Sequence, residues 1–290
     1  MDQRIIDLYD SFTHGLINRR DFMDRLTAVA GSSAAALALL PMLQNDYARA
    51  ATVAVDDARL ATETVSYDAG GTKISGYLAR PKSKGKRPAI IVIHENRGLN
   101  PHIQDIARRL ALEGFLALAV DMLSPQGGTP GDEDKARDMF AALKLDETAQ
   151  QIAAAVPFVA RHAESTGNVG AVGFCWGGGM VNRVAVLSPE LKAGVAYYGA
   201  QPPAAQVPSI HAALLLHYAG LDTRINAGIP AYEAALKAAG KRYAIYVYPD
   251  VNHAFNNDTG GDRYNKPAAD LAWSRTLAFF KENLGAPPKG

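Results

Sequence analysis

The stretch from Val169 to Met180 constrains this chain more than any other part of it, and it reads Val-Gly-Ala-Val-Gly-Phe-Cys-Trp-Gly-Gly-Gly-Met. Its apolar beginning predicts a strand, and its glycine-rich end predicts the start of a helix. The turn between them has the form Gly-x-nucleophile-x-Gly, in which a strained backbone presents the central side chain and the glycines allow close approach. The pattern predicts that Cys175 is a nucleophile, against the commoner alternative of a buried structural thiol.

Composition limits what else the chain can do. Cys175 is the only cysteine among 290 residues, which excludes an internal disulfide and a cysteine-based metal cluster. Hydrophobic residues make up 48% of the chain and charged residues 20%, values typical of a soluble globular enzyme. The formal net charge is +1 and no basic stripe stands out, so nucleic-acid binding has no electrostatic support. Because no histidine and carboxylate cluster shows ligand spacing, we expect neither a metal nor a cofactor.

Beyond residue 56, the apolar pattern predicts strands that alternate with helices. Besides the strand that opens the elbow, strands are expected at 65–67, 73–79, 89–94, 115–120, 194–198, 213–218 and 242–248, and helices at 102–113, 133–162, 228–239 and 267–283. The β-branched run at 89–94 is typical of a central parallel strand that is covered on both faces. The alternation predicts one α/β domain over 56–290, with a doubly wound, mostly parallel sheet flanked by helices.

An activated thiol needs a base, and the base needs an orienting group. Asp222 lies four residues after the strand expected at 213–218, and His253 follows the strand expected at 242–248. Nucleophile, acid and histidine thus occur in order, each after a strand, which favours a triad of Cys175, Asp222 and His253. Asp250 competes as the acid, but it follows the same strand as His253 and is too close in sequence to face the ring. The remaining histidines are poorer candidates for the base, because they are expected in strands, helices or other loops: His14, His94, His102, His162, His211 and His217.

These motifs together resemble the dienelactone hydrolase family of α/β-hydrolases over about residues 63–284. The matching segments are Gly173-Phe-Cys-Trp-Gly-Gly178, His94-Glu95-Asn-Arg-Gly-Leu99, Asp222 and His253-Ala-Phe255. The resemblance implies an α/β-hydrolase fold and the hydrolysis of esters or lactones. It also implies that Glu95 contacts the resting thiol and keeps it protonated. The backbone N–H groups of Trp176 and Asn96 would then stabilise the oxyanion.

Two departures from the family pattern bear on the substrate. Family members bind a substrate carboxylate with two arginines, whereas the corresponding positions here, the loop at 121–127 and Asn257, contain none. Arg97 or Arg263 would be replacement cations, although such residues are more often solvated or salt-bridged. An anionic dienelactone is therefore not the expected substrate. We expect a largely apolar pocket instead, lined by Trp176, Tyr198, Tyr218, Phe255 and Met122.

Residues 1–55 form a leader that differs from the rest of the chain. Arg19-Arg20, Phe22, the apolar run at 26–43 and Ala48-Arg-Ala50 resemble a twin-arginine export signal with its cleavage site, although acidic residues flank the arginines. The apolar run is too short to span a membrane and contains Pro41, so no stable membrane insertion is expected. A functional signal would make the protein periplasmic or exported, and otherwise it would be cytoplasmic. The alternative is an uncleaved helical hairpin that packs on the domain or on a second subunit, as in a homodimer.

We therefore expect a cysteine-dependent hydrolase of activated esters or strained lactones, acting on small molecules. A thiolate leaves a tetrahedral intermediate more easily than an amine or an unactivated alkoxide does, which disfavours amides. Two alternatives are left open. One is acyl transfer to an acceptor other than water, and the other is a non-catalytic binding protein that docks through the leader. The second would be expected to have lost a triad residue, and all three are present.

Overall fold

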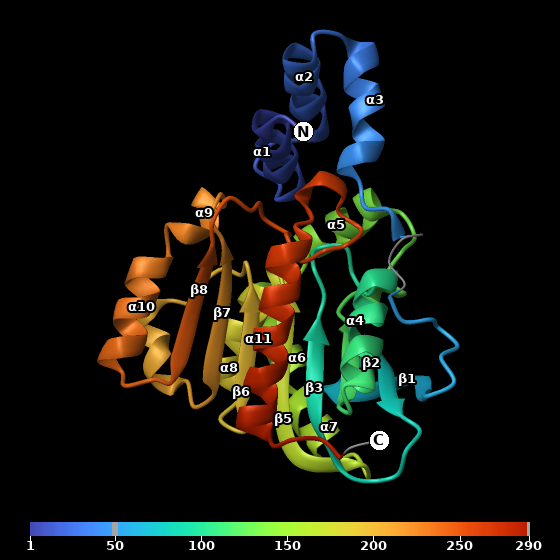
Figure 1. Ribbon diagram of the computed structural model, residues 1–290, viewed down its shortest axis with the longest axis vertical. Helices are drawn as coiled ribbons and strands as arrows, with labels where there is room; N and C mark the ends of the chain where they lie inside the picture. The colour runs from blue at the N-terminus through green and yellow to red at the C-terminus, as the bar shows by residue number, and fades with distance from the viewer. Residues whose placement is uncertain (48–51, 289–290) are drawn as a thin grey trace.

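The computed structural model describes residues 1–47 and 52–288, and these form one eight-stranded mixed sheet flanked by helices (Figure 1). The strand order is β1-β2-β4-β3-β5-β6-β7-β8. Neighbours from β4 through β3 to β8 pair in parallel, and β2 pairs antiparallel with both β1 and β4. The predicted α/β fold is confirmed. The strands are β1 (Leu60–Ala69), β2 (Thr72–Pro81), β3 (Arg87–Ile93), β4 (Leu116–Asp121), β5 (Ser165–Phe174), β6 (Ala193–Tyr197), β7 (Ala213–Ala219) and β8 (Tyr243–Tyr248).

Helices cover both faces of the sheet, which explains the unbroken apolar run at 89–93 of β3. Ile91 and Ile93 pack into one core with α6, α7, α8 and α10, while Ile90 and Val92 pack into the other with α4 and α11. Successive side chains of a strand point to opposite faces, so each layer receives every second residue. The helices after the sheet begins are α4 (Pro101–Leu112), α5 (Glu133–Ala141), α6 (Leu145–Ala153), α7 (Ala155–Ala160), α8 (Trp176–Leu187), α9 (Thr223–Asn226), α10 (Ile229–Ala238) and α11 (Lys266–Leu284).

The helical stretch predicted at 133–162 is divided into α5, α6 and α7. Pro157 accounts for the break between the last two, because a proline ring clashes with the carbonyl four residues earlier in a continuous helix. That carbonyl belongs to Ala153, the last residue of α6. The division places α5 close to the end of the sheet where the parallel strands finish (Figure 1).

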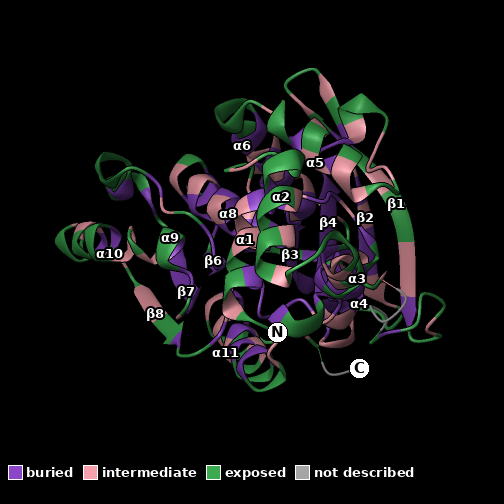
Figure 2. Ribbon diagram, turned by 90° about the horizontal axis from the view of Figure 1, so that it is seen from above, coloured by how far each residue is buried: buried purple, intermediate pink, exposed green. Residues whose placement is uncertain are grey.

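Three helices before the sheet form an N-terminal extension, here residues 1–47. They are α1 (Gln3–Thr13), α2 (Arg19–Ala30) and α3 (Ser33–Leu43). Side chains of Asp2, Asn18 and Ser32 accept backbone N–H groups at the three helix starts, as helix-capping residues do. The helices share a small core of Ile5, Tyr9, Phe12, Phe22, Leu26, Ala36 and Leu43. The extension lies over the end of the sheet to which the parallel strands point (Figure 1), with α1 and α2 above the middle of the molecule (Figure 2).

The paired arginines begin α2 in this structure. Arg19 forms an ion pair with Asp134 of α5, and Phe22 is buried in the extension's core. No single helix among the described residues is long and apolar enough to cross a membrane. Helices α2 and α3 are long and apolar enough only when taken together, and they meet at a bend of 111°. The predicted cleavage site at Ala48-Arg-Ala50 lies outside the described residues, and export stays a prediction.

We expect Phe22→Ala to unfold the extension locally. The Phe22 ring is 1% exposed and stacks on Phe12 at a centroid distance of 4.6 Å, and losing a buried phenylalanine costs about 3–5 kcal/mol. Hydrogen–deuterium exchange should show faster exchange in α1, α2 and α3 with unchanged protection in β3 and β5. Leu37→Ala, at a 59% exposed position of α3, is the control. Unchanged exchange in the extension of the Phe22 variant would contradict this account of its core.

Candidate active site

Cys175 lies in a strained turn between β5 and α8. Its φ of 55° and ψ of −116° fall outside the regions that a cysteine normally adopts. The glycines around it are required by close backbone contacts. A Cβ on Gly173 would lie 2.1 Å from the Gly177 carbonyl oxygen, and one on Gly177 would lie 2.3 Å from that of Ile93. The turn therefore holds the sulfur in place at the carboxyl end of the sheet, as the sequence predicts for a nucleophile.

Asp222 and His253 meet at the same end of the sheet. Asp222 follows β7 and His253 follows β8, and Nδ1 of the imidazole lies 2.5 Å from Oδ2 of the carboxylate. The other carboxylate oxygen accepts the Ile225 N–H at 3.1 Å, which fixes the orientation of the acid. Burial raises the pKa of Asp222, but the bond and charge of His253 outweigh it and lower the pKa overall. Nε2 of His253 is buried and makes no hydrogen bond to any described residue.

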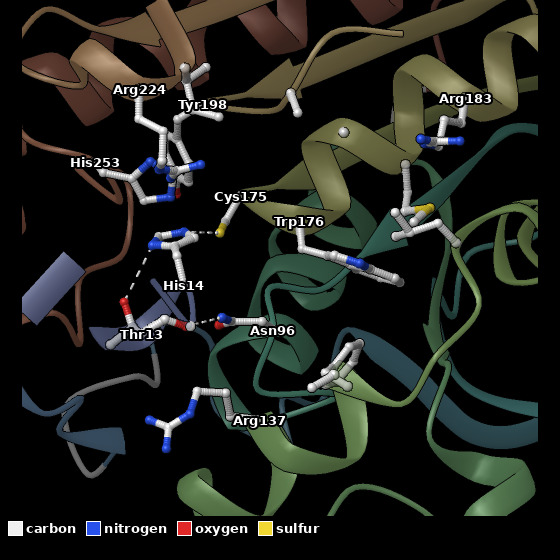
Figure 3. A pocket seen from close by; sticks show the side chains of 18 of the residues that line it. Thr13, His14, Asn96, Arg137, Cys175, Trp176, Arg183, Tyr198, Arg224 and His253 are labelled. Carbon is white, nitrogen blue, oxygen red and sulfur yellow. Dashed lines mark hydrogen bonds between the residues drawn. The ribbon is translucent and has the colours of Figure 1, made fainter. Parts of the chain in front are cut away.

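A second imidazole reaches the thiol from the N-terminal extension (Figure 3). His14, the residue that follows α1, places Nε2 3.3 Å from Sγ of Cys175. Its Nδ1 lies 2.8 Å from the backbone oxygen of Asp10 and 3.2 Å from Oδ1 of the same residue. The His14 and His253 rings meet edge to face, with centroids 4.7 Å apart.

The sequence analysis places His14 among the poorer candidates for the base, whereas the structure places its ring within hydrogen-bond distance of the thiol. One signal was available, because Asp10 and His14 are four residues apart, a spacing that puts two side chains on the same face of a helix. Nothing in the sequence indicated that this face would meet Cys175, since that contact joins residues 161 positions apart.

These charges set the protonation of the thiol. Burial raises the pKa of Cys175, but the positive charges of His253 and His14 outweigh burial and lower the pKa to about 6. Burial lowers the pKa of His14, yet the thiolate and Asp10 raise it to about 9. The pKa of His253 is raised well above its ordinary value, since Cys175, Asp10 and Asp222 outweigh burial. Near neutral pH the site therefore favours a thiolate flanked by imidazolium groups.

Glu95 lies close to the site but is bonded to Asn257. The Asn257 side-chain NH₂ donates to Oε2 of Glu95 at 2.9 Å, and Thr259 donates to the Asn257 oxygen, which fixes the amide orientation. The remaining Glu95 oxygen is buried without a hydrogen-bond partner among the described residues. The thiol hydrogen bond that the structure contains is made to His14 instead. The expected contact between Glu95 and the thiol stays a prediction.

The two predicted oxyanion donors lie beside Cys175 in different settings. Trp176 is the first residue of α8, where a backbone N–H has no partner within its own helix. Asn96 belongs to the loop after β3, and its side-chain NH₂ donates to the Thr13 carbonyl at 2.7 Å. Arg97 donates to the Asn96 side-chain oxygen at 2.7 Å. The end of α1 is thus attached to the loop that carries one of the predicted donors.

A cavity of about 430 Å³ opens onto Cys175, His14 and His253. Of the residues predicted to line an apolar pocket, Trp176 and Tyr198 line it. The others do not: Met122, Tyr218 and Phe255 are buried in the cores on either side of the sheet, and Arg97 is buried beside Glu133 with 3.2 Å between Nε and Oε2. Met122, Tyr218 and Phe255 follow or end strands, and their side chains pack in the cores and do not line the cavity.

The cavity wall is more cationic than the sequence suggested, because Arg137, Arg183 and Arg224 line it (Figure 3). Their partners are Asp134, Asp146 and Asp10, at 3.1, 2.7 and 3.8 Å. Asp146 is 91% exposed, so its pairing with Arg183 is weak. Arg263, the other predicted replacement cation, lies elsewhere and bonds to the Leu43 carbonyl and the Asn45 side chain of the extension.

Sulfur and imidazole donors of His14, Cys175 and His253 all lie within 4.8 Å of one another, a set that could also hold a zinc-type cation. The sequence could not indicate this grouping because it depends on His14. A cation held by all three residues would occupy the proposed nucleophile.

We expect Asn257→Ala to lower stability by about 1.5–3 kcal/mol, because it removes a donor from a buried carboxylate. Urea unfolding measures the loss in unfolding free energy, provided that the slope of this free energy against urea concentration is unchanged. In the background of Glu95→Gln the same substitution should cost less, since the acceptor is then neutral. A loss that is equal in both backgrounds would show that the two side chains are not coupled.

Comparison with known proteins finds relatives over most of the chain. The family model described as the dienelactone hydrolase family matches residues 74–284, and one described as YqhI-like matches residues 1–31. A protein of Escherichia coli O157:H7, provisionally named a carboxymethylenebutenolidase, is 36% identical over 246 residues, covering 79% of this chain and 90% of the relative. A relative of the same name from Methylorubrum extorquens is 31% identical over 277 residues, covering 90% and 93% of the two chains.

A solved structure from Klebsiella pneumoniae, provisionally named a dienelactone hydrolase, superposes with a TM-score of 0.69 at 29% identity. It covers 77% of this chain and 99% of its own. The chain therefore belongs to the dienelactone hydrolase family and is a hydrolase that acts on esters or lactones.

Proposed function

We propose that the protein hydrolyses esters or lactones through a thioester on Cys175, with His253 as acid and base and Asp222 as its orienting group. The observation that carries the proposal is the pair of His253 and Asp222, 2.5 Å apart, beside a cysteine held in a strained turn. The unpartnered Nε2 of His253 supports it, because a buried nitrogen without a bond is available to exchange protons with substrate or water.

The reaction proceeds in two halves. The Cys175 thiolate attacks the carbonyl carbon, and the electron pair of the C=O bond moves to the oxygen, which accepts the backbone N–H groups of Trp176 and Asn96. The C–O bond then breaks, and the leaving alkoxide takes a proton from Nε2 of His253. Water next attacks the thioester, gives its proton to Nε2, and the C–S bond breaks to release the acid and the thiolate.

Activated esters and strained lactones are the proposed substrates. Because a thiolate is itself a good leaving group, the first intermediate goes forward only when the alcohol leaves readily or ring strain is released. The cavity adds a preference for a negative charge on the substrate. Arg183 supports this part of the proposal, since its partner Asp146 is exposed and can be displaced by a substrate carboxylate.

We expect Cys175→Ala to lose essentially all turnover of p-nitrophenyl acetate, whose leaving group is activated. The substitution removes the nucleophile, and p-nitrophenolate release measured by absorbance checks it. Retention of full activity would exclude the thioester mechanism.

We expect mono-p-nitrophenyl succinate to be a better substrate than neutral p-nitrophenyl butyrate, by about tenfold in kcat/KM, which corresponds to about 1.4 kcal/mol. Arg183→Gln should remove most of this preference, and added salt should reduce it. Arg161→Gln, at an exposed position outside the cavity, is the matched control. An equal preference in both variants would contradict the role given to Arg183.

A second candidate activity is transfer of the acyl group from the same thioester to an alcohol, and in that case turnover should rise when alcohol is added.

Export is a separate proposal based on the paired arginines, and the contacts between the extension and the site favour retention of the extension in the mature protein instead. Sequencing of the mature N-terminus from the native host distinguishes the two, since an intact Met1 excludes cleavage.

A further inference from the structure

We infer that His14 is a further catalytic residue, supplied by the N-terminal extension: its imidazole holds the proton of Cys175 and stays paired with the thiolate. This rests on the proposed cysteine mechanism. It makes the extension a part of the catalytic centre, which is built from α1 on one side and from the sheet on the other (Figure 3).

The hydrogen-bond pattern fixes the direction of the proton. Nδ1 of His14 lies 2.8 Å from the Asp10 backbone oxygen, and a carbonyl oxygen can only accept. Nδ1 therefore carries a hydrogen, and in the neutral ring Nε2 is left as an acceptor. Nε2 lies 3.3 Å from Sγ, so it can take the thiol proton and then donate it back as an imidazolium N–H.

Several contacts hold α1 where this geometry requires it. The Thr13 carbonyl accepts the Asn96 side chain at 2.7 Å, and Gln3 donates to Asn252 at 2.5 Å. The Arg137 guanidinium lies 4.2 Å from the centre of the Phe12 ring. These contacts lie at both ends of α1 and involve three separate loops or helices of the sheet domain. His14 is thus positioned by tertiary structure and not by a single flexible contact.

The charges around Cys175 and His14 favour this ion pair. Asp10 on α1 and Asp222 after β7 each face one imidazole, and Arg224 of α9 lies 3.8 Å from Asp10. Tyr198 after β6 packs on His253, and Glu95 is a further buried carboxyl group. Asp10 and Asp222 thus each face one imidazolium group, and Arg224 pairs with Asp10. Burying a thiolate here is feasible because the imidazole that bonds to it is itself paired with a carboxylate.

Because the site has two imidazoles, the proton transfers of the reaction are divided between His14 and His253. His14 receives the thiol proton and keeps it, so the sulfur attacks as a thiolate. His253, whose Nε2 is unpartnered, gives a proton to the leaving alkoxide and takes one from water. When the C–S bond breaks, the electron pair returns to sulfur beside the His14 imidazolium. Proton and electron counts are then the same as at the start.

The test is His14→Gln in the full chain, with His211→Gln as the matched control because His211 is exposed and remote from the cavity. Glutamine can bond to sulfur but cannot hold its proton. The rate of alkylation of the single cysteine by iodoacetamide is followed against pH in buffer with a chelator, and kcat is measured on p-nitrophenyl acetate. We expect the alkylation midpoint to rise by about one pH unit or more, since an opposite charge is lost. We expect kcat to fall by about 100-fold with a smaller change in KM.

An unchanged midpoint overturns the proposal, whatever happens to kcat, because a fall in kcat alone would reflect structural damage. Asp10→Asn provides a second variant that keeps His14 in place, and it should shift the midpoint in the same direction by a smaller amount. Alkylation needs no substrate, so it reports on His14 even if the Cys175 variants show that hydrolysis does not proceed through a thioester.

Discussion

The organisation of this site depends on one interaction, the pairing of a buried thiolate with imidazolium groups. A thiolate is unstable in an apolar interior, and the free thiol has a pKa near 8.5, so neutral pH alone would leave it protonated. Here His14 bonds to the sulfur, a ring nitrogen of His253 lies within 4.8 Å of it, and each imidazole has a carboxylate behind it. The strained turn at Cys175 matters because it presents the sulfur to both rings.

This interaction links parts of the chain that have separate hydrophobic cores. Cys175, Asp222 and His253 follow strands of the sheet, while Asp10 lies in α1 and His14 follows it, on a helix stabilised by its own aromatic cluster. Two positions considered for contacts with substrate make internal contacts instead. Arg263 bonds to the backbone of α3, and Asn257 restrains Glu95, where family members would have an arginine facing substrate.

Sequence patterns predicted the sheet, the elbow and the positions of Asp222 and His253, because those features depend on local periodicity and on strand order. They did not predict His14, whose role depends on how α1 docks across the carboxyl end of the sheet. The predicted lining of the pocket was partly wrong for a related reason. Tyr218 and Phe255 are adjacent to site residues in sequence, but their side chains point into packed layers, and Arg183 enters the cavity from the second turn of α8 with no motif to mark it.

The most direct measurement is a pH titration of the ultraviolet absorbance of the thiolate in the unmodified protein. Cys175 is the only cysteine, so the signal belongs to one group. A transition centred near pH 6 is predicted, because the positive charges of His253 and His14 outweigh burial. A single transition at about pH 8.5 or above, the range of a free or simply buried thiol, would contradict the account.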